Sequence, residues 1–428
     1  MQNSGIKSFP KNFWTAITME FFERGSYYGV MSVLSVFLIL SVDEGGLGFS
    51  KESVGVIKSI ITPLLYILPI ISGAIADRFG YRKTLFFAFS VMSLGYLLTS
   101  FSTTYSTVFA SLLLMVLGAG VFKPIISGTI ARSTDSNNSG LGFGIFYWSI
   151  NLGAFLFPLF LIPYLKQLGW NYIFIMAAVG TGWLLLLNLF VYKEPQRPQT
   201  QKTLLQVLSE MVLVIRDYKF ILMIVIYSGF WILYFQMFDT VLWYLKDYVD
   251  MTPVDKAVNS ILAIFVKNPA WKFDTEHVTV INAGTIIALQ LVISSIVKNT
   301  KALPTMIVGI AMGTIGMGIL AISDHAWVFI IGLIIFSLGE MTAHPKFISY
   351  IGLIAPDDKK ALYLGYSFLY GVIGSGIGGI LGAFTYVKFV DEMGKPSLLW
   401  FMFSLIGVAT ILGLYLFNRY LSPKKAAS

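Results

Sequence analysis

The chain has 428 residues, of which 56% are hydrophobic and 12% are charged, and its mean hydropathy is +0.76. Soluble domains carry about 25% charged residues, so this composition excludes an ordinary soluble protein and indicates a polytopic membrane protein. The formal net charge is +8; anionic lipid at the inner membrane surface accounts for it, and no nucleic-acid partner is expected. The chain contains no cysteine, which excludes disulfide bonds, thiolate metal sites and thiol catalysis.

Twelve stretches are long and apolar enough to cross a bilayer, because about 20 apolar residues span a hydrocarbon core about 30 Å thick. In chain order the predicted spans are 12–41, 52–76, 83–100, 105–131, 142–165, 171–192, 219–246, 278–297, 303–322, 326–350, 361–387 and 397–420. Six spans on each side of a polar middle predict an all-α membrane protein with two pseudo-symmetric six-helix bundles around a midplane site.

The predicted bundles are residues 1–192 and 219–428, joined by a cytoplasmic linker at 193–218. The linker contains KEPQRPQTQK, which is polar and holds two prolines, and such clusters indicate loops. The next residues, LLQVLSEMVLVIRD, have apolar positions at helical spacing, so we expect an interfacial helix there. The longest outer loop, 247–277, contains VDKAVNSILAIFVKNP, whose apolar core is too short to span and favours a surface helix.

Basic residues set the expected orientation. With a cytoplasmic N-terminus, 18 of the 30 Lys and Arg residues fall on the inner side, 8 on the outer side and 4 within spans. This bias predicts that both termini face the cytoplasm. We expect a multi-pass protein of a prokaryotic plasma (inner) membrane. The first apolar run is too long for a cleavable signal peptide and carries charges, so it is predicted to be a retained span.

The first predicted span contains a charged stripe in the stretch MEFFERGSYYG. Glu20, Glu23 and Arg24 share one helical face, and Tyr27 and Tyr28 continue that face. A charge near the bilayer centre costs at least about 2.5–3.5 kcal/mol on insertion scales. Charges in this position are therefore predicted to serve an ion or substrate pathway.

Five further charged residues fall within predicted spans: Lys58, Lys123, Asp239, Glu340 and Lys346. Lys58 lies near the outer end of its span, and we expect its side chain to snorkel. For Lys346, snorkelling and a functional role both stay open, and Asp239 is either a structural carboxylate or a functional one. Lys123 and Glu340 lie well inside their spans, where they and the charged stripe can neutralise one another around a hydrated cavity.

The loop between the second and third spans reads GAIADRFGYRK. It resembles the signature loop of the major facilitator superfamily, GxxxDRxGRRx, with Tyr81 where Arg is usual. Asp77 and Arg78 lie close to a helix end, where ion pairs and dipole contacts can latch the two bundles in one state. Positive-inside charge alone would not require this Asp-Arg-x-Gly pattern.

Four motifs in the expected order resemble the proton-dependent oligopeptide transporter (POT) family. EFFERGSYYG is similar to the ExxER…YYG motif of the first helix, and GAGVFKPIISGTIAR to the motif of the fourth. FGIFYWSINLGAF is similar to FYxxINxG of the fifth helix, and SLGEMTAHPKFISYIGLIAP to GExxxSP…LAP of the tenth. Several ordered motifs are far more specific than any one of them.

The resemblance implies proton-coupled import of di- and tripeptides by alternating access. It implies that Glu20, Glu23 and Arg24 form the proton-coupling group and exchange ion pairs with Lys123. Glu340 would bind the amino end of the substrate or take part in proton transfer. The residues implied to line the substrate pocket are Tyr27, Tyr28, Tyr66, Lys123, Asn151, Trp231, Asn282 and Glu340.

Charge complementarity supports this outline, because a peptide zwitterion needs a cation and an anion in its site. Lys123 can hold the carboxylate of a peptide, and Glu340 can hold its ammonium group. The energy source would be the proton gradient, with no cofactor or metal; the three histidines, His277, His325 and His344, show no ligand spacing. The expected partners are the solute, protons and the lipid bilayer, and the chain is expected to be a monomer.

Three positions depart from the family pattern. Met31 stands where an Arg helps to bind the peptide carboxylate, and Phe235 stands where an acid serves the extracellular gate. Asp239 lies four residues further, about one helical turn, and can substitute for that gating acid. His344 stands where the tenth-helix motif usually has Ser, and Lys346 adds a positive charge nearby. These changes weaken the case for standard peptide specificity more than the case for proton coupling.

Other functions remain open at this stage. The substrate can be a non-peptide amphoteric or anionic solute, or the carrier can export drugs or metabolites in exchange for protons. A membrane enzyme is not expected, since the chain has no Cys, no clustered His and no GxSxG. A receptor or scaffold differs in one testable respect, because replacing the buried charges would leave its function unaffected.

Overall fold

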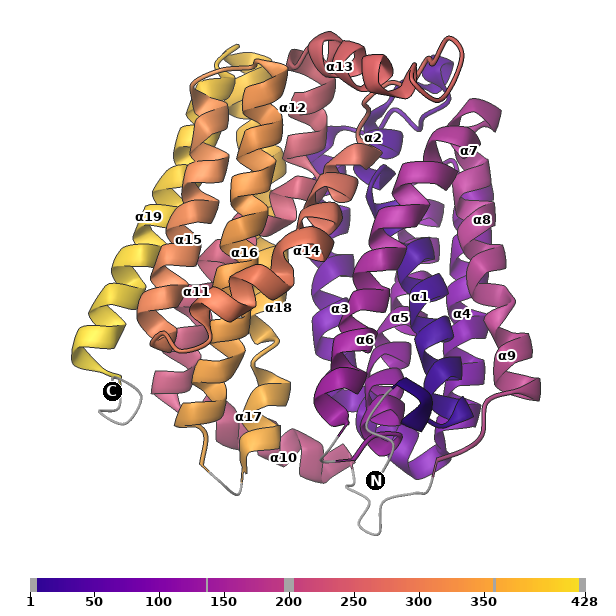
Figure 1. The fold of residues 1–428 in the computed structure, drawn as a ribbon, viewed down its shortest axis with the longest axis vertical. Coiled ribbons are helices and arrows are strands. Elements are labelled where there is room, and N and C mark those ends of the chain that lie inside the picture. The colour runs from indigo at the N-terminus through magenta and orange to yellow at the C-terminus, as the bar shows by residue number, and fades with distance from the viewer. Residues whose placement is uncertain (1–5, 136–137, 196–203, 357–358, 423–428) are drawn as a thin grey trace. The chain divides into compact units, whose positions relative to one another are not determined.

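The structure, a computed structural model, describes residues 6–135, 138–195, 204–356 and 359–422. These residues are mostly helical, and no strand occurs among them (Figure 1). They divide into two compact units. Unit 1 comprises 1–31, 40–49 and 60–217, and unit 2 comprises 32–39, 50–59 and 218–428. The predicted bundle boundaries stay a prediction, and the central residues of the predicted linker, 196–203, lie outside the described residues.

Unit 1 is built from the helices of the N-terminal half, coloured indigo to magenta in Figure 1. They are α1 (Lys11–Met31), most of α3 (Lys51–Phe79), α4 (Tyr81–Phe101), α5 (Tyr105–Arg132), α6 (Ser139–Leu156), α7 (Ile162–Leu168), α8 (Trp170–Gly182), α9 (Leu184–Phe190) and α10 (Leu204–Ile215), with the short turns η1 (Ile6–Ser8), η2 (Val42–Glu44) and η3 (Phe157–Leu161).

Unit 2 contains the helices of the C-terminal half and two short segments from the N-terminal half. They are α2 (Leu34–Ile39), the first turns of α3, α11 (Tyr218–Phe235), α12 (Thr240–Tyr248), α13 (Thr252–Leu262), α14 (Glu276–Val297), α15 (Ala302–Gly318), α16 (Ala326–Ile354), α17 (Lys360–Tyr366), α18 (Leu369–Tyr386) and α19 (Pro396–Tyr420), with the turns η4 (Gln236–Phe238), η5 (Ile319–Ala321) and η7 (Val387–Glu392).

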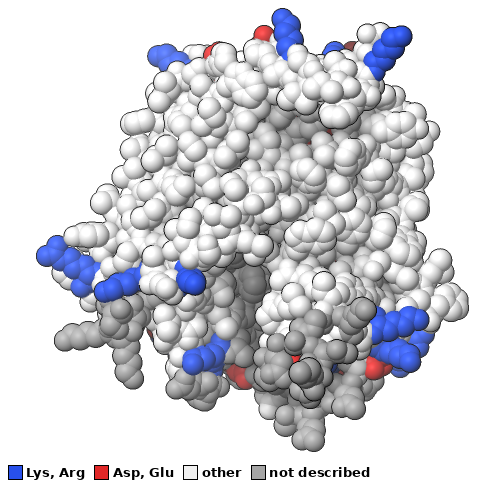
Figure 2. Space-filling model, in the orientation of Figure 1, with Lys and Arg blue, Asp and Glu red and all other residues white. Residues whose placement is uncertain are grey.

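The prediction of twelve membrane-spanning segments is confirmed. Among the described residues, eleven helical segments are long and apolar enough to cross a membrane. The twelfth is α1, which has the length of a span but carries the charged stripe and Lys11. On the face seen in Figure 2, the Lys and Arg side chains lie at the upper edge and in the lower half, and the surface between them is white.

Two predicted surface helices are also present. The segment after the linker forms α10, in which Val212, Leu213 and Ile215 are about half exposed. The outer loop forms α13, which begins at Thr252 and is followed by an irregular turn. Asn259 fixes this turn, since its amide group exchanges two hydrogen bonds with the main chain of Trp271, at 2.7 and 2.9 Å.

Close helix contacts in unit 2 depend on glycine. A Cβ atom added to Gly339 on α16 would lie 2.5 Å from the carbonyl oxygen of Gly309 on α15, and one added to Gly309 would lie 2.7 Å from the oxygen of Gly339. The glycine-rich α18 approaches α11 in the same way, since a Cβ on Gly374 would lie 2.6 Å from the Cβ of Trp231. Small residues let membrane helices pack backbone to backbone, and this packing places α16 against α15 and α11 against α18.

Candidate functional site

The charged stripe of α1 forms a buried ion-pair group in unit 1. Glu20, Glu23 and Arg24 are 2%, 0% and 8% exposed. The Arg24 guanidinium donates from Nε to Glu23 Oε2 at 2.5 Å and from Nη2 to Glu23 Oε1 at 2.7 Å. Its Nε also lies 3.8 Å from Glu20 Oε1. One cation therefore neutralises two carboxylates only in part, and the group needs a second positive charge nearby.

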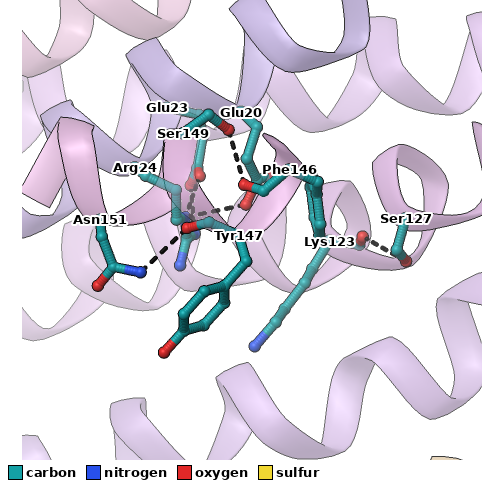
Figure 3. Close-up of polar contacts among 9 residues, drawn as sticks. All are labelled: Glu20, Glu23, Arg24, Lys123, Ser127, Phe146, Tyr147, Ser149 and Asn151. Atoms are coloured by element: carbon teal, nitrogen blue, oxygen red, sulfur yellow. Dashed lines mark hydrogen bonds and ion pairs between the residues drawn. The ribbon is translucent and has the colours of Figure 1, made fainter. Parts of the chain in front are cut away.

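Lys123 on α5 supplies that second charge. It lies in the electrostatic field of Glu20, Glu23 and Arg24, so two acids and two bases together balance. Figure 3 shows its side chain extended, and Ser127 donates a hydrogen bond to its carbonyl oxygen at 3.2 Å. The amine end lies over an aromatic ring.

Tyrosine and asparagine side chains surround these four residues. The ring of Tyr66 on α3 lies below Lys123, with Nζ 5.4 Å from its centroid, and the ring of Tyr27 lies below Arg24, with Cζ 4.8 Å from its centroid. Tyr28 packs edge-on against Tyr27 at 5.2 Å. Asn151 on α6 donates to the Tyr147 carbonyl at 3.0 Å (Figure 3). Tyr27 and Tyr66 therefore lie against the cations of this group, and the roles of all the predicted unit 1 residues stay predictions.

Tyr96 on α4 was not predicted from the sequence as a site residue. Its side chain is fully buried and lies in the field of Glu23, Tyr27 and Arg24. Within the described residues its hydroxyl has no hydrogen-bond partner, and the same holds for Glu20 Oε2 and Ser26 Oγ. Buried polar atoms without partners are rare and often mark functional sites or bound water. The sequence feature that could have pointed to Tyr96 is a tyrosine within a predicted membrane span.

Unit 2 holds a second polar group, centred on Glu340 of α16. Asn282 on α14 donates from Nδ2 to Glu340 Oε2 at 2.9 Å and to Ser337 Oγ at 3.0 Å. In the part of the chain that the structure describes, no ion pair joins Glu340 to a basic side chain. A carboxylate in this setting can receive a cationic group of a ligand.

Aromatic rings line the surroundings of this group. Trp231 on α11 is 5% exposed and stacks on Tyr370 of α18, with ring centroids 4.5 Å apart. His344 on α16 packs edge-on against Trp231 at 5.3 Å, and its Nδ1 lies 3.3 Å from the Tyr227 hydroxyl. Trp231 was expected in the pocket; Tyr227 and Tyr370 were not singled out from the sequence.

Comparison with known proteins identifies the superfamily of this chain. The model of the Major Facilitator Superfamily matches residues 16–269. The chain belongs to that superfamily. A di-/tripeptide transporter of Lactococcus lactis subsp. lactis (strain IL1403) is 30% identical over 242 residues, which cover 53% of this chain and 46% of that protein. The match therefore spans less than half the length of this relative.

Two solved structures share the fold of this facilitator protein over nearly its whole length. A POT family transporter in complex with a thioalcohol-conjugated peptide is 20% identical, with a TM-score of 0.79, covering 98% of this chain and 100% of that chain. A POT family transporter in complex with 5-aminolevulinic acid is 21% identical, with a TM-score of 0.77, covering 98% and 99%. At these identities the likeness establishes the fold.

The superfamily's signature loop has a defined geometry here. Gly80, between α3 and α4, has φ +98°, a backbone conformation that favours glycine. Asp77 pairs with Arg132 of α5 at 3.0 Å, and the Arg132 guanidinium lies 4.3 Å from the ring centroid of Tyr81. Tyr81, which replaces the usual Arg, therefore provides a platform for Arg132. The Arg78 guanidinium lies 5.7 Å from the ring centroid of Phe79, and the latch role of Asp77 and Arg78 stays a prediction.

Lys58 and Asp239 form a buried ion pair within unit 2. Lys58 Nζ on α3 lies 3.2 Å from Asp239 Oδ1, which precedes α12, and the two residues are 5% and 6% exposed. The prediction that Lys58 snorkels is therefore wrong, because its amine is held by a carboxylate. The gating role of Asp239 stays a prediction. Lys346 donates to the carbonyl oxygen of Thr300 at 2.7 Å, beyond the C-terminal end of α14, where positive charge is favourable.

Proposed function

We propose that the chain is a proton-coupled symporter that imports di- and tripeptides or peptide-like solutes by alternating access. The observation that carries this proposal is the buried group of Glu20, Glu23 and Arg24 with Lys123 nearby. Titratable charges are costly inside a membrane protein and are retained for ion or substrate movement. The Lactococcus lactis relative is a di-/tripeptide transporter, and one POT-fold neighbour is in complex with a conjugated peptide; both support the substrate class.

The coupling step follows from charge balance. A proton bound by Glu23 removes the charge that the Arg24 guanidinium neutralises through two hydrogen bonds. Arg24 and Lys123 then carry excess positive charge, which favours a substrate carboxylate in their neighbourhood. When the substrate leaves and the proton is released, the Arg24–Glu23 pair forms again. Proton binding and carboxylate binding thus promote each other.

The ammonium end of the substrate is assigned to Glu340. Its hydrogen bond from Asn282 fixes the position of the carboxylate. Because no ion pair joins this carboxylate to a basic side chain among the described residues, it favours a cationic ligand. A ligand that binds one state of a carrier more tightly than another shifts the equilibrium towards that state, as alternating access requires.

A non-peptide amphoteric solute is the second candidate. Met31, where the POT pattern has Arg, leaves the site with one cation fewer for a peptide carboxylate. The POT-fold neighbour in complex with 5-aminolevulinic acid supports a smaller amphoteric molecule. Both candidates place the chain among transporters of the inner membrane, with no cofactor beyond the proton gradient. The monomeric state and the cytoplasmic termini stay predictions.

Uptake into liposomes tests the proposal. Purified protein is reconstituted, an inward proton gradient with an inside-negative potential is imposed, and labelled dialanine and trialanine are added outside. We expect gradient-dependent accumulation that a protonophore abolishes. Binding of dialanine without any accumulation would contradict symport. Accumulation of 5-aminolevulinic acid but of neither peptide would favour the second candidate.

A further inference from the structure

A histidine lies one helical turn after the acid of unit 2. Glu340 and His344 are four residues apart on α16, which is continuous from Ala326 to Ile354. Side chains at this spacing share one face of a helix and interact. Asn282 holds Glu340 from the neighbouring α14 through its 2.9 Å hydrogen bond. The face of α16 thus presents a carboxylate and an imidazole next to each other.

The imidazole is held by side chains from two other helices. Tyr227 on α11 places its hydroxyl 3.3 Å from His344 Nδ1. The rings of Trp231 and Tyr370 meet the imidazole edge-on, with centroids at 5.3 and 5.7 Å. A tyrosine hydroxyl can donate to a neutral imidazole nitrogen and accept from a protonated one. Both protonation states of His344 can therefore keep this hydrogen bond.

On α16 itself the charged and titratable groups besides His344 are Glu340, Lys346 and Tyr350. The amine of Lys346 bonds the Thr300 carbonyl oxygen, and the Tyr350 hydroxyl lies 3.2 Å from Ser422 Oγ. Tyr227 and Tyr370 are the groups on α11 and α18, and α15 contains no titratable residue. The other helices packed against α16 carry Asp255 and Lys256 on α13, Glu276 and His277 at the start of α14, and Lys360, Tyr363 and Tyr366 on α17.

We propose that His344 is a second proton-binding group of unit 2 which, when protonated, pairs with Glu340 and competes with the substrate ammonium group for that carboxylate. The acid lies N-terminal to the cation at i, i+4, which is the favourable order for such a pair on a helix. Histidine ordinarily titrates near pH 6.5, within the range that an external medium covers. The competition with an ammonium group rests on the function proposed above.

The consequence is that the affinity for the substrate falls at acid pH. When His344 is protonated, the ammonium group of the substrate must displace the imidazolium from Glu340. When the imidazole is neutral, Glu340 is available to the substrate. Proton binding at the group on α1 and proton binding at His344 then act on substrate affinity in opposite directions.

The first test measures the KM for dialanine uptake at external pH values from 5 to 8. In the unmodified protein we expect the KM to rise by about two- to fivefold between pH 7.5 and 5.5, the effect of a helical ion pair strengthened by partial burial. His344→Asn should remove this rise. His325→Asn is the matched control, because His325 caps the same helix by accepting from the Trp327 main-chain N–H, and it should keep the rise. A rise that persists in His344→Asn would overturn the proposal.

The second test does not depend on transport. The chain has three histidines, so the imidazole signals of histidine-labelled protein in detergent can be followed by NMR, and His344→Asn assigns one of them. We expect this signal to titrate between pH 5 and 8. In Glu340→Gln the midpoint of its titration should change, while the titration midpoints of the other two histidines should stay as they are in the unmodified protein. If the His344 signal does not titrate, or if its midpoint is the same in Glu340→Gln, the proposal that His344 is a proton site would be overturned. If dialanine is not transported at any pH, the proposed substrate fails, and this titration still decides the proton site.

Discussion

The Arg24 guanidinium donates two parallel hydrogen bonds to the carboxylate of its neighbour in sequence, Glu23, at 2.5 and 2.7 Å. Such fork-like pairs combine charge with fixed geometry and are among the strongest hydrogen-bonded contacts in proteins. Both side chains are buried, so separating them without neutralising Glu23 would leave an uncompensated charge. In the coupling step proposed above, Arg24 is released only when Glu23 loses its charge.

Glu23→Gln and Glu20→Gln test this coupling. Each should abolish proton-driven accumulation of dialanine, because the glutamine cannot exchange a proton, while exchange of labelled for unlabelled substrate without a gradient continues. The measurement is uptake with and without the gradient in the same liposomes. Glu44→Gln is the control, because Glu44 is exposed and accepts a hydrogen bond from Ser41. Undiminished accumulation in both buried variants would refute the assignment.

Lys123→Gln should raise the KM for dialanine by about 10- to 100-fold, the range expected for losing a hydrogen bond to a charged group. Lys123→Arg should retain part of the affinity, because the positive charge is kept. Lys166→Gln is a matched control, since Lys166 lies over the ring of Trp170, away from the charged group of α1. An unchanged KM in Lys123→Gln would remove this residue from the substrate site.

The Lys58–Asp239 pair is predicted to stabilise unit 2 strongly. Breaking a buried pair by removing one partner costs about 3–5 kcal/mol, whereas replacing both partners by apolar residues costs much less. Thermal unfolding in detergent should therefore show larger losses for Lys58→Met and for Asp239→Leu than for the double variant. Glu392→Gln breaks the exposed Lys388–Glu392 pair and should change stability by at most about 1 kcal/mol. Additive losses from the two buried substitutions would show that the pair is not coupled.

Gly339→Ala is expected to destabilise the α15–α16 contact by about 1–3 kcal/mol, the usual cost of overpacking. The added methyl group would lie 2.5 Å from the Gly309 carbonyl oxygen. Gly352→Ala lies on the same helix with nothing within 4 Å of the added Cβ, so it should be neutral or slightly stabilising. Thermal unfolding of both variants measures the difference, and equal effects would contradict the close packing.

The sequence predicted the spans and the charged stripe because both depend on local patterns. Hydropathy over about 20 residues marks a span, and helical spacing places Glu20, Glu23 and Arg24 on one face. The pairing of Lys58 with Asp239 could not be predicted, because the two residues lie on different helices far apart in the sequence and only packing brings them together. Tyr96 was missed for the same reason, since a tyrosine in an apolar span carries no sign of its neighbours.

The aromatic setting of His344 also depends on packing. The sequence showed that an imidazole replaces the usual Ser, and the structure adds that Tyr227, Trp231 and Tyr370 from two other helices surround it. Spacing along α16 relates His344 to Glu340, whereas the close contact of α11 and α18 through Gly374 decides which rings it meets. The replacement of Ser by His344 could therefore be interpreted physically only once the neighbours of His344 were known.

Substrate-driven proton movement tests the central claim most directly. Liposomes that contain the protein and a trapped pH-sensitive dye are held at equal internal and external pH with an inside-negative potential, and dialanine is added outside. Coupled symport predicts that the interior acidifies when dialanine is added and that Glu23→Gln abolishes this response. No pH change during measurable dialanine uptake, or an interior that becomes alkaline, would contradict proton-coupled symport.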